Sequence, residues 1–357
     1  MVYRAAVIGL TGIAAAPLRA GPLHPALGGV WPHSHAPAYA ALPNTQVVAV
    51  CDLKADLLDQ FRQNWQDTWP EVRTYTDYRE MLQQEEIDLL SVVTSDHRHA
   101  DIVVDAAEGG VRGILCEKPI ATTLADADRM IAACEARGTV MSIHHSRRWR
   151  PLWHAARAQV WDGRLGAVRR IVGSIGSPRA MLFRNGTHLI DTICWFAGSE
   201  PEWVVGVLDE EHAGYGPRYA GDGGRDPALD PGGTALVHFQ NGVRAIVNCS
   251  KRMVRSFELQ VFAERGRLRV DDTSAEMWFT APGAQYESHV AVPVPYTQRA
   301  ETCAAILELI DLMERGGTSS QTASPPQEAR KALSIILAIL QSQADGNVPV
   351  RFPIVDR

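Results

Sequence analysis

Short apolar runs alternate with longer helical segments through the first 146 residues, and this alternation constrains the fold more than any other feature. The runs are Ala5–Gly9, Val47–Cys51, Leu89–Thr94, Gly113–Cys116 and Val140–His144. The segments with helical periodicity are Leu57–Trp65, Tyr78–Gln84, His99–Gly109 and Leu124–Arg137. Such alternation is typical of βαβ units, whose parallel strands form a sheet covered on both faces. We therefore predict an α/β domain over residues 1–146.

After Pro151 the pattern changes to longer segments in which apolar and polar residues alternate. These segments are Val168–Gly173, Ala235–Phe239, Val243–Asn248, Phe257–Phe262 and Arg267–Val270. The sequence Gln-Asn-Gly at 240–242 is typical of a hairpin, so we predict a mostly antiparallel sheet. Helical patterns that are expected to cover one face of it are His188–Phe196, Ala300–Arg315 and Pro326–Gln343. With 357 residues the chain divides into two domains, 1–146 and 147–357.

Charge and cysteine usage exclude several classes of protein. The formal net charge of -6 leaves no positive excess with which to bind nucleic acid or an anionic membrane. The six cysteines show no C-x-x-C spacing, which argues against a disulfide framework and a thiolate zinc site. We expect a cytoplasmic protein with free thiols and no metal site. The apolar run after Arg4 is also compatible with a secretory signal, but its glycines favour a buried first strand.

The first apolar run ends in Gly-Leu-Thr-Gly-Ile-Ala, beginning at Gly9. A dinucleotide-binding fold needs glycine where the chain turns sharply and where backbone N–H groups approach a pyrophosphate. Gly9 matches the first position of that pattern, whereas Thr11 replaces its second glycine. We predict that Gly9, Thr11, Gly12 and Ile13 bind a dinucleotide, with an ordinary turn as the alternative.

Asp52 ends the second run, where an acidic side chain accepts hydrogen bonds from the adenosine ribose and repels a 2′-phosphate. This position favours NAD over NADP. The separation from Gly9 is 43 residues rather than about 20. The excess lies in Ala15–Ser34, which we interpret as an insertion that delays the first helix and forms either a flap over the site or a surface loop.

Several short motifs, in this order and spacing, resemble the Gfo/Idh/MocA oxidoreductases. They include the glycine turn and six short sequences: His-Ala-Pro-Ala at 35–38, Thr-Ser-Asp-His-Arg-His at 94–99, Cys-Glu-Lys-Pro at 116–119, Arg-Arg-Trp-Arg-Pro at 147–151, Gly-Arg-Leu-Gly at 163–166 and Gly-Thr-His-Leu-Ile-Asp at 186–191. The resemblance implies a Rossmann domain, a second α/β domain whose open sheet commonly forms the interface of a homodimer or homotetramer, and a site in the cleft between them. It also implies a cis bond before Pro119. Further cofactor contacts are implied at Thr94, Ser95, Asp96, His99, Glu117, Lys118 and Pro119.

The same resemblance implies that Lys118 and His188 are catalytic. An ammonium at a strand end polarises a developing alkoxide, and an imidazole relays a proton near neutral pH. Asp191 lies one helical turn after His188 and is expected to orient the substrate or the histidine. The alternatives are an exposed lysine, a capping histidine and a surface aspartate.

Arg184 departs from the family pattern, because many members carry an aspartate four residues before the histidine. Arginine is always charged and does not act as a base. We therefore expect Arg184 to bind an anionic group of the substrate or to pair with a local acid. His145, Arg148 and Trp149 are further candidates for substrate binding, although core packing is as plausible for the tryptophan.

The sequence leads to three hypotheses about function. The first is an NAD-dependent dehydrogenase that acts on a secondary alcohol of a sugar, cyclitol or related polyol. The second is a redox-neutral enzyme that uses tightly bound NAD to cleave or eliminate a glycosidic group. The third is a nucleotide-binding relative without turnover, against which the presence of Lys118 and His188 argues.

Overall fold

The computed structural model describes residues 2–16, 32, 34–219, 226–281, 283–294 and 301–355. The chain forms two compact units, which are treated separately below. The N-terminal unit comprises Met1–Ala121, Ala125–Ser146 and Gln298–Gln327, and the C-terminal unit comprises Thr122–Leu124, Arg147–Thr297 and Glu328–Arg357.

The N-terminal unit contains a six-stranded parallel sheet in the order β3-β2-β1-β4-β5-β6. Its strands are β1 (Tyr3–Ile8), β2 (Thr45–Cys51), β3 (Arg73–Tyr75), β4 (Leu89–Val92), β5 (Gly113–Cys116) and β6 (Val140–Ile143). All residues of β4, β5 and β6 are buried, as expected for strands covered on both faces. This order is that of a Rossmann fold, whose binding edge lies at the carboxyl ends of β1 and β4. The sequence missed only β3, which has three residues, one of them buried.

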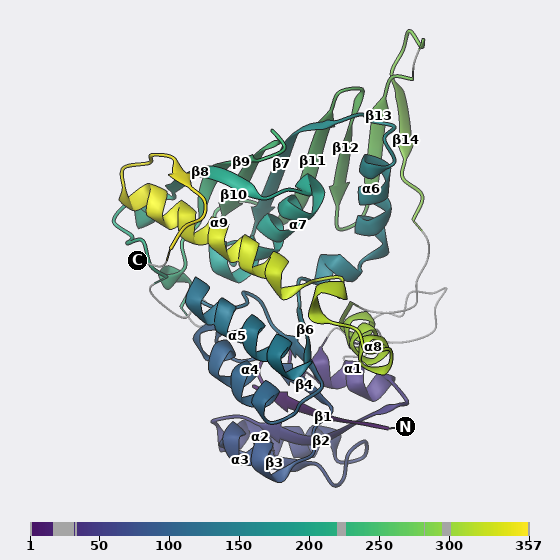
Figure 1. Ribbon diagram of the computed structural model, residues 1–357, viewed down its shortest axis with the longest axis vertical. Helices are drawn as coiled ribbons and strands as arrows, with labels where there is room; N and C mark the ends of the chain where they lie inside the picture. Colours follow the sequence, from purple (N-terminus) through teal and green to yellow (C-terminus); the bar gives the residue numbers. More distant parts are fainter. Residues whose placement is uncertain are drawn as a thin grey trace. The chain divides into compact units, whose positions relative to one another are not determined.

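Helices cover both faces of this sheet (Figure 1). They are α1 (His35–Ala41), α2 (Ala55–Trp65), α3 (Tyr78–Gln84), α4 (His99–Glu108), α5 (Leu124–Arg137) and α8 (Glu301–Glu314). The caps follow local rules: the Asp77 carboxylate accepts a hydrogen bond from Arg79 N at the start of α3, and Gly138 has a φ of 67° just after α5.

The segment that contains α8 belongs to the N-terminal unit, although the domain limits expected from the sequence place it in the second domain. Tyr3 donates to Glu314 on α8 over 2.7 Å. The Ser319 hydroxyl accepts a hydrogen bond from Met141 N over 2.9 Å. A Cβ on Gly113 would lie 2.6 Å from the Met313 sulfur, so α8 packs directly on β5. These contacts join residues more than 170 positions apart, which no local pattern reveals. The second stretch of the N-terminal unit ends at Ser146.

The C-terminal unit contains a nine-stranded sheet in the order β14-β13-β12-β11-β7-β10-β9-β8-β15. Its strands are β7 (Val168–Gly176), β8 (Pro201–Leu208), β9 (Gly233–Phe239), β10 (Arg244–Ser250), β11 (Ser256–Ala263), β12 (Gly266–Asp271), β13 (Ala275–Phe279), β14 (Ser288–Ala291) and β15 (Val350–Arg351). Only the pair β7 and β10 is parallel. The predicted hairpin joins β9 and β10. The sheet is therefore mostly antiparallel, as predicted.

Helices α6 (Pro151–Trp161), α7 (Thr187–Ala197) and α9 (Pro326–Ala344) pack on one face of this sheet (Figure 1). Glycines permit the close approach: a Cβ on Gly173 of β7 would lie 2.8 Å from Ile193 of α7, and one on Gly206 of β8 would lie 2.6 Å from Ile339 of α9. Helix α6 and strands β8, β13, β14 and β15 were not expected from the sequence.

Two further properties follow from the described residues. No helix among them combines the length and apolar character needed to cross a membrane. All six cysteines are buried, and none of them takes part in a disulfide bond.

Candidate active site

The glycine turn leads from β1 to the edge of the sheet where β4 also ends. Gly9 has a φ of 88°, and a Cβ there would lie 2.4 Å from the carbonyl oxygen of Val93. Only glycine fits this position, for reasons of both conformation and space. The predicted cofactor residues Thr11, Gly12 and Ile13 follow it and are exposed.

Asp52 lies against this turn. Its Oδ2 accepts a hydrogen bond from Leu10 N over 2.8 Å, and its Oδ1 accepts one from Lys54 N over 3.0 Å. The structure therefore brings together two parts of the predicted cofactor site that are 42 residues apart. Each carboxylate oxygen keeps a second lone pair, which is what recognition of two ribose hydroxyls requires.

Helix α1 begins next to the end of the glycine turn. His35 N donates to Ile13 O over 3.0 Å, and Ala36 N donates to Ala14 O over 2.8 Å. The delayed helix expected from the sequence thus begins at His35, with its first turn on the glycine turn. The predicted flap falls mainly on residues 17–31 and 33, which lie outside the described residues.

The loop from Thr94 to His99 follows β4, as expected. Asp96 and His99 are buried. The ring nitrogens of His99 lie 3.0 Å from the carbonyl oxygen of Pro119 and 3.2 Å from that of Thr94. His99 thus connects this loop with the loop after β5, which contains Lys118. The Lys118–Pro119 bond is cis, as the family resemblance implies.

Glu117, between β5 and Lys118, is the centre of a buried polar cluster. Its Oε1 lies 2.8 Å from His144 Nδ1 and 3.2 Å from His35 Nε2. On the far side of the His35 ring, Nδ1 lies 2.9 Å from the Ser91 hydroxyl, which lies 3.0 Å from the Tyr39 hydroxyl. We refer to Tyr39, Ser91, His35, Glu117 and His144 as the Glu117 cluster.

The protonation states in this cluster follow from burial and hydrogen bonding. Burial disfavours ionisation of Glu117, but the hydrogen bonds from His144 and His35 and the charge of Lys118 outweigh it and hold the pKa of the carboxyl well below its usual value. Burial also lowers the pKa of His35, more than its hydrogen bond to Glu117 raises it. At neutral pH the cluster therefore contains an ionised carboxylate and a neutral His35.

In the C-terminal unit, His188 occupies the first turn of α7 and is half-buried. A π-helical turn, Leu182–Gly186, precedes the helix. The buried Asp230 carboxylate accepts hydrogen bonds from Phe183 N over 3.1 Å and from Arg184 N over 2.8 Å. Asp230 therefore fixes the backbone of the turn that carries Arg184 and leads to His188. The sequence did not identify Asp230, because it lies 46 residues after Arg184 in a loop.

Arg148 and Asp191, both expected to bind substrate, form a buried bidentate ion pair. Nε and an Nη of Arg148 lie 2.9 and 2.8 Å from the two carboxylate oxygens of Asp191. Their side chains are 4% and 1% exposed. The pair ties the short helical turn before α6 to α7, where Asp191 lies three residues after His188, so its observed contacts are those of a scaffold.

The half-buried Arg184 is close enough to the exposed Arg179 for their charges to interact. Partial burial and the positive charge of Arg184 both lower the pKa of Arg179. Both guanidinium groups belong to the segment that leads to His188. Of the remaining candidates, His145 is buried and Trp149 is half-buried. Trp153 packs in the core against Phe196 and Phe257.

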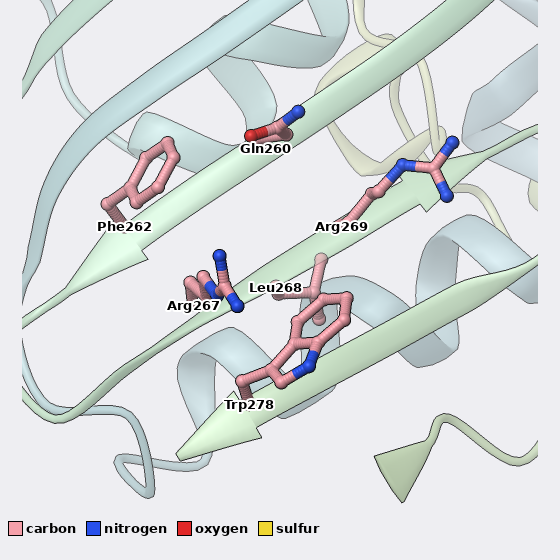
Figure 2. Close-up of a pocket in the computed structure, with 6 residues that line it drawn as sticks. All are labelled: Gln260, Phe262, Arg267, Leu268, Arg269 and Trp278. Carbon is pink, nitrogen blue, oxygen red and sulfur yellow. The ribbon is translucent and has the colours of Figure 1, made fainter. Parts of the chain in front are cut away.

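The face of the nine-stranded sheet opposite its helices, called the open face below, is partly exposed: Leu236 and Ile246 on it are 38% and 41% exposed. Val205, Leu236, Ile246 and Val172 lie directly opposite one another on β8, β9, β10 and β7. Figure 2 shows a depression farther along the sheet, between β11, β12 and β13. It is lined by Gln260, Phe262, Arg267, Leu268, Arg269 and Trp278. None of the predicted site residues lines this depression.

Comparison with known proteins gives consistent matches for both units. The profile of an oxidoreductase family with an NAD-binding Rossmann fold, GFO/IDH/MocA, matches residues 27–145, and the profile of the GFO/IDH/MocA C-terminal domain matches residues 153–269. D-apiose dehydrogenase from Paraburkholderia graminis is 28% identical over 65% of this chain and 60% of its own length. Myo-inositol 2-dehydrogenase from Thermotoga maritima is 24% identical over 67% of this chain and 71% of its own length.

Solved structures show the same fold. Levoglucosan dehydrogenase in complex with NADH and L-sorbose superposes with a TM-score of 0.79 at 18% identity, covering 99% of this chain and 100% of that one. Aldose-aldose oxidoreductase from Caulobacter crescentus gives a TM-score of 0.76 at 20% identity, with the same coverage.

Proposed function

The chain belongs to the Gfo/Idh/MocA family of NAD(P)-binding oxidoreductases, and on that premise we propose that it is an NAD-dependent dehydrogenase of a sugar, cyclitol or related polyol. The observation that carries the proposal is the hydrogen bond between Asp52 and the glycine turn, at the sheet edge where β5 presents Lys118. The dehydrogenase relatives named above act on D-apiose and myo-inositol. Both are polyhydroxy compounds with secondary alcohols.

The residues of the N-terminal unit have distinct roles in this proposal. Gly9 allows the backbone to approach a pyrophosphate, and Asp52 accepts hydrogen bonds from the adenosine ribose and repels a 2′-phosphate. Bound NAD supplies the hydride acceptor. Lys118 donates a hydrogen bond to the reacting hydroxyl and stabilises the negative charge that develops on its oxygen.

In the C-terminal unit, His188 takes the proton that the hydroxyl releases and transfers it to solvent. Arg184 replaces the aspartate common in the family, so proton transfer rests on His188 and Lys118. We propose that Arg184 instead binds an anionic group on the substrate, because a guanidinium forms bidentate hydrogen bonds with carboxylate or phosphate. The charge of Arg179 nearby strengthens this attraction.

We also propose that the open face of the nine-stranded sheet binds a second copy of the chain to form a dimer or tetramer. Leu236 and Ile246 are 38% and 41% exposed at the centre of the apolar row on that face. An exposed row of β-branched and leucine side chains on a flat sheet is typical of an interface.

The proposal is tested by following absorbance at 340 nm with NAD and a panel of neutral and acidic polyols and glycosides. We expect NADH to form with at least one polyol. Lys118→Ala should abolish turnover while NADH affinity stays within about threefold, and His188→Ala should lower kcat by about 10²–10⁴-fold.

Three outcomes separate the hypotheses. Near wild-type rates in both variants would refute the catalytic assignment. Product formation from a glycoside without net NADH would favour the redox-neutral enzyme. NADH binding without turnover on any compound would favour a nucleotide-binding protein.

A further inference from the structure

The π-helical turn before α7 starts a helical segment, so its first amides need hydrogen-bond acceptors from elsewhere in the chain. Leu182 N donates to the carbonyl oxygen of Pro231 over 2.8 Å. The next two amides, of Phe183 and Arg184, donate to the two different oxygens of the Asp230 carboxylate, which belongs to a residue that is 0% exposed. Asp230 and Pro231 therefore cap this turn as an N-cap residue caps a helix, but from a distant part of the sequence.

The loop that carries Asp230 is itself anchored on the sheet and on the segment after β8. Lys251 directly follows β10, and its ammonium donates to the carbonyl oxygens of Pro227 over 3.0 Å and Asp230 over 3.3 Å. The Tyr215 hydroxyl donates to the carbonyl oxygen of Leu229 over 2.7 Å. The carboxylate thus acts on the turn from a loop whose own backbone is held in place.

The turn and helix α7 are held by different groups. The buried Phe183 ring stacks on Tyr219, with the ring centroids 3.9 Å apart and the planes 18° apart, so a second contact to the turn also comes from the segment between β8 and β9. In α7 the Thr192 hydroxyl donates to the carbonyl oxygen of His188 over 2.7 Å. The segment between β8 and β9 therefore fixes the backbone at Arg184, whereas His188 is fixed within its own helix.

We propose that Asp230 is a positioning residue for substrate specificity: its carboxylate sets the direction in which the turn presents Arg184, and thereby the preference for a substrate with an anionic group. This inference rests on the proposed function, because it assumes that Arg184 binds that group. A planar guanidinium makes two parallel hydrogen bonds to a carboxylate or phosphate, so a small rotation of the backbone at Arg184 weakens the contact. A neutral substrate lacks the anionic group and is insensitive to this rotation.

The test uses the full-length protein with NAD, a sugar acid from the 340 nm panel and the corresponding neutral sugar. Asp230→Asn keeps the shape of the side chain but places an amide NH2 group against one of the two N–H donors. We expect KM for the sugar acid to rise about tenfold, while kcat and KM for the neutral sugar stay within about threefold. Hydrogen exchange at the amides of Phe183 and Arg184 should become faster, because the variant satisfies only one of them.

Coupling to Arg184 separates a positioning role from a structural one. If Asp230 acts through Arg184, Asp230→Asn has no further effect once residue 184 is alanine. KM for the sugar acid in Arg184→Ala and in the double variant Arg184→Ala/Asp230→Asn should then agree within about twofold. A residue that only stabilises the fold weakens binding by the same factor in both backgrounds.

The matched control is Asp226→Asn, which changes the same type of side chain in the same loop. The Asp226 carboxylate accepts from Ala228 N over 2.9 Å, within the loop itself, and its loss should leave KM for both sugars unchanged. Lys251→Met removes the ammonium that holds the Asp230 carbonyl oxygen. It should raise KM for the sugar acid less than Asp230→Asn does, and it provides the same measurements if Asp230→Asn does not fold.

Each contrary result has a distinct meaning. If KM for the sugar acid rises in Arg184→Ala but not in Asp230→Asn, the positioning role is overturned and the proposed function stands. If Asp230→Asn raises KM for both sugars alike, or adds its effect to that of Arg184→Ala, its role is structural and the inference fails. If Arg184→Ala changes neither KM, the assignment of Arg184 in the proposed function fails and the inference fails with it.

Discussion

Each of the two units buries a carboxylate beside a predicted catalytic residue, but they stabilise it in different ways. In the N-terminal unit, Glu117 is held by imidazoles, of which His35 is neutral, next to Lys118. In the C-terminal unit, Asp191 is held by the permanently charged Arg148, on the helix that carries His188. Imidazoles change charge near neutral pH, whereas a guanidinium does not.

The difference indicates that the two buried sites serve different purposes. A bidentate arginine–aspartate pair is rigid and independent of pH over the physiological range, which suits a scaffold for α7. The position and charge of a carboxylate held by imidazoles depend on pH and on small changes in its donors. This suits a group that modulates the reactivity of a neighbouring residue. The following predictions test this contrast, from the largest expected effect to the smallest.

Removal of Arg148 should have the largest effect on stability. Arg148→Met leaves Asp191 charged and buried, which costs about 3–5 kcal/mol in the free energy of unfolding. Urea denaturation measures this loss. The matched control, Arg351→Met, breaks an exposed pair with Glu202 and should cost no more than about 1 kcal/mol.

The double variant Arg148→Met/Asp191→Leu should regain most of that stability, because a buried ion pair replaced by apolar side chains leaves no unpaired charge. A double variant as unstable as Arg148→Met would contradict the scaffold role of the ion pair. It would also contradict the proposed difference between the buried carboxylates of the two units.

Arg184→Ala should alter substrate recognition alone. A charge-assisted hydrogen bond contributes about 1.5–3 kcal/mol, so KM for an anionic substrate should rise about 10–100-fold with kcat less affected. Initial rates with a sugar acid and the corresponding neutral sugar provide the comparison. An equal effect on both substrates would exclude anion recognition by Arg184.

Asp52→Ala should alter cofactor recognition alone. Loss of the carboxylate removes ribose hydrogen bonds and the repulsion of a 2′-phosphate. The ratio of the Kd for NADP to the Kd for NAD should therefore fall about tenfold. Calorimetric titration with both cofactors measures the preference. Tighter binding of NADP by the wild-type protein would refute the assignment before any variant is made.

The smallest expected effect is on the pH dependence of the free energy of unfolding. His35 has a lowered pKa in the folded protein, so below its ordinary value of 6.5 the unfolded chain binds a proton that the folded chain does not. The free energy of unfolding should therefore decrease from pH 7.5 to pH 5.5, and His35→Gln should reduce this decrease. His238→Gln, on the open sheet, serves as the control. A decrease of the same size in wild type and His35→Gln would exclude His35 as the source.

Much of the fold was predictable because its signals are local. Periodicity revealed every strand of the N-terminal sheet except β3, whose three residues are too few to form a pattern. Gly9 was identifiable because a left-handed φ and close packing against Val93 leave glycine as the only fit. Asp52 lies against the glycine turn because the carboxyl ends of adjacent parallel strands meet at one edge; its role in cofactor binding remains a prediction.

The sequence by itself thus determined the alternation of elements, the two kinds of sheet and the residue types at the strand ends. Tertiary structure alone decided which side chains pair, because pairing depends on how the chain returns through space. Glu117 meets His35 from 82 residues away, Arg148 meets Asp191 from 43 residues away, and α8 packs on the sheet that the chain left at Ser146. Periodicity specifies which face of an element is buried, but the partner on that face is set only when distant elements pack.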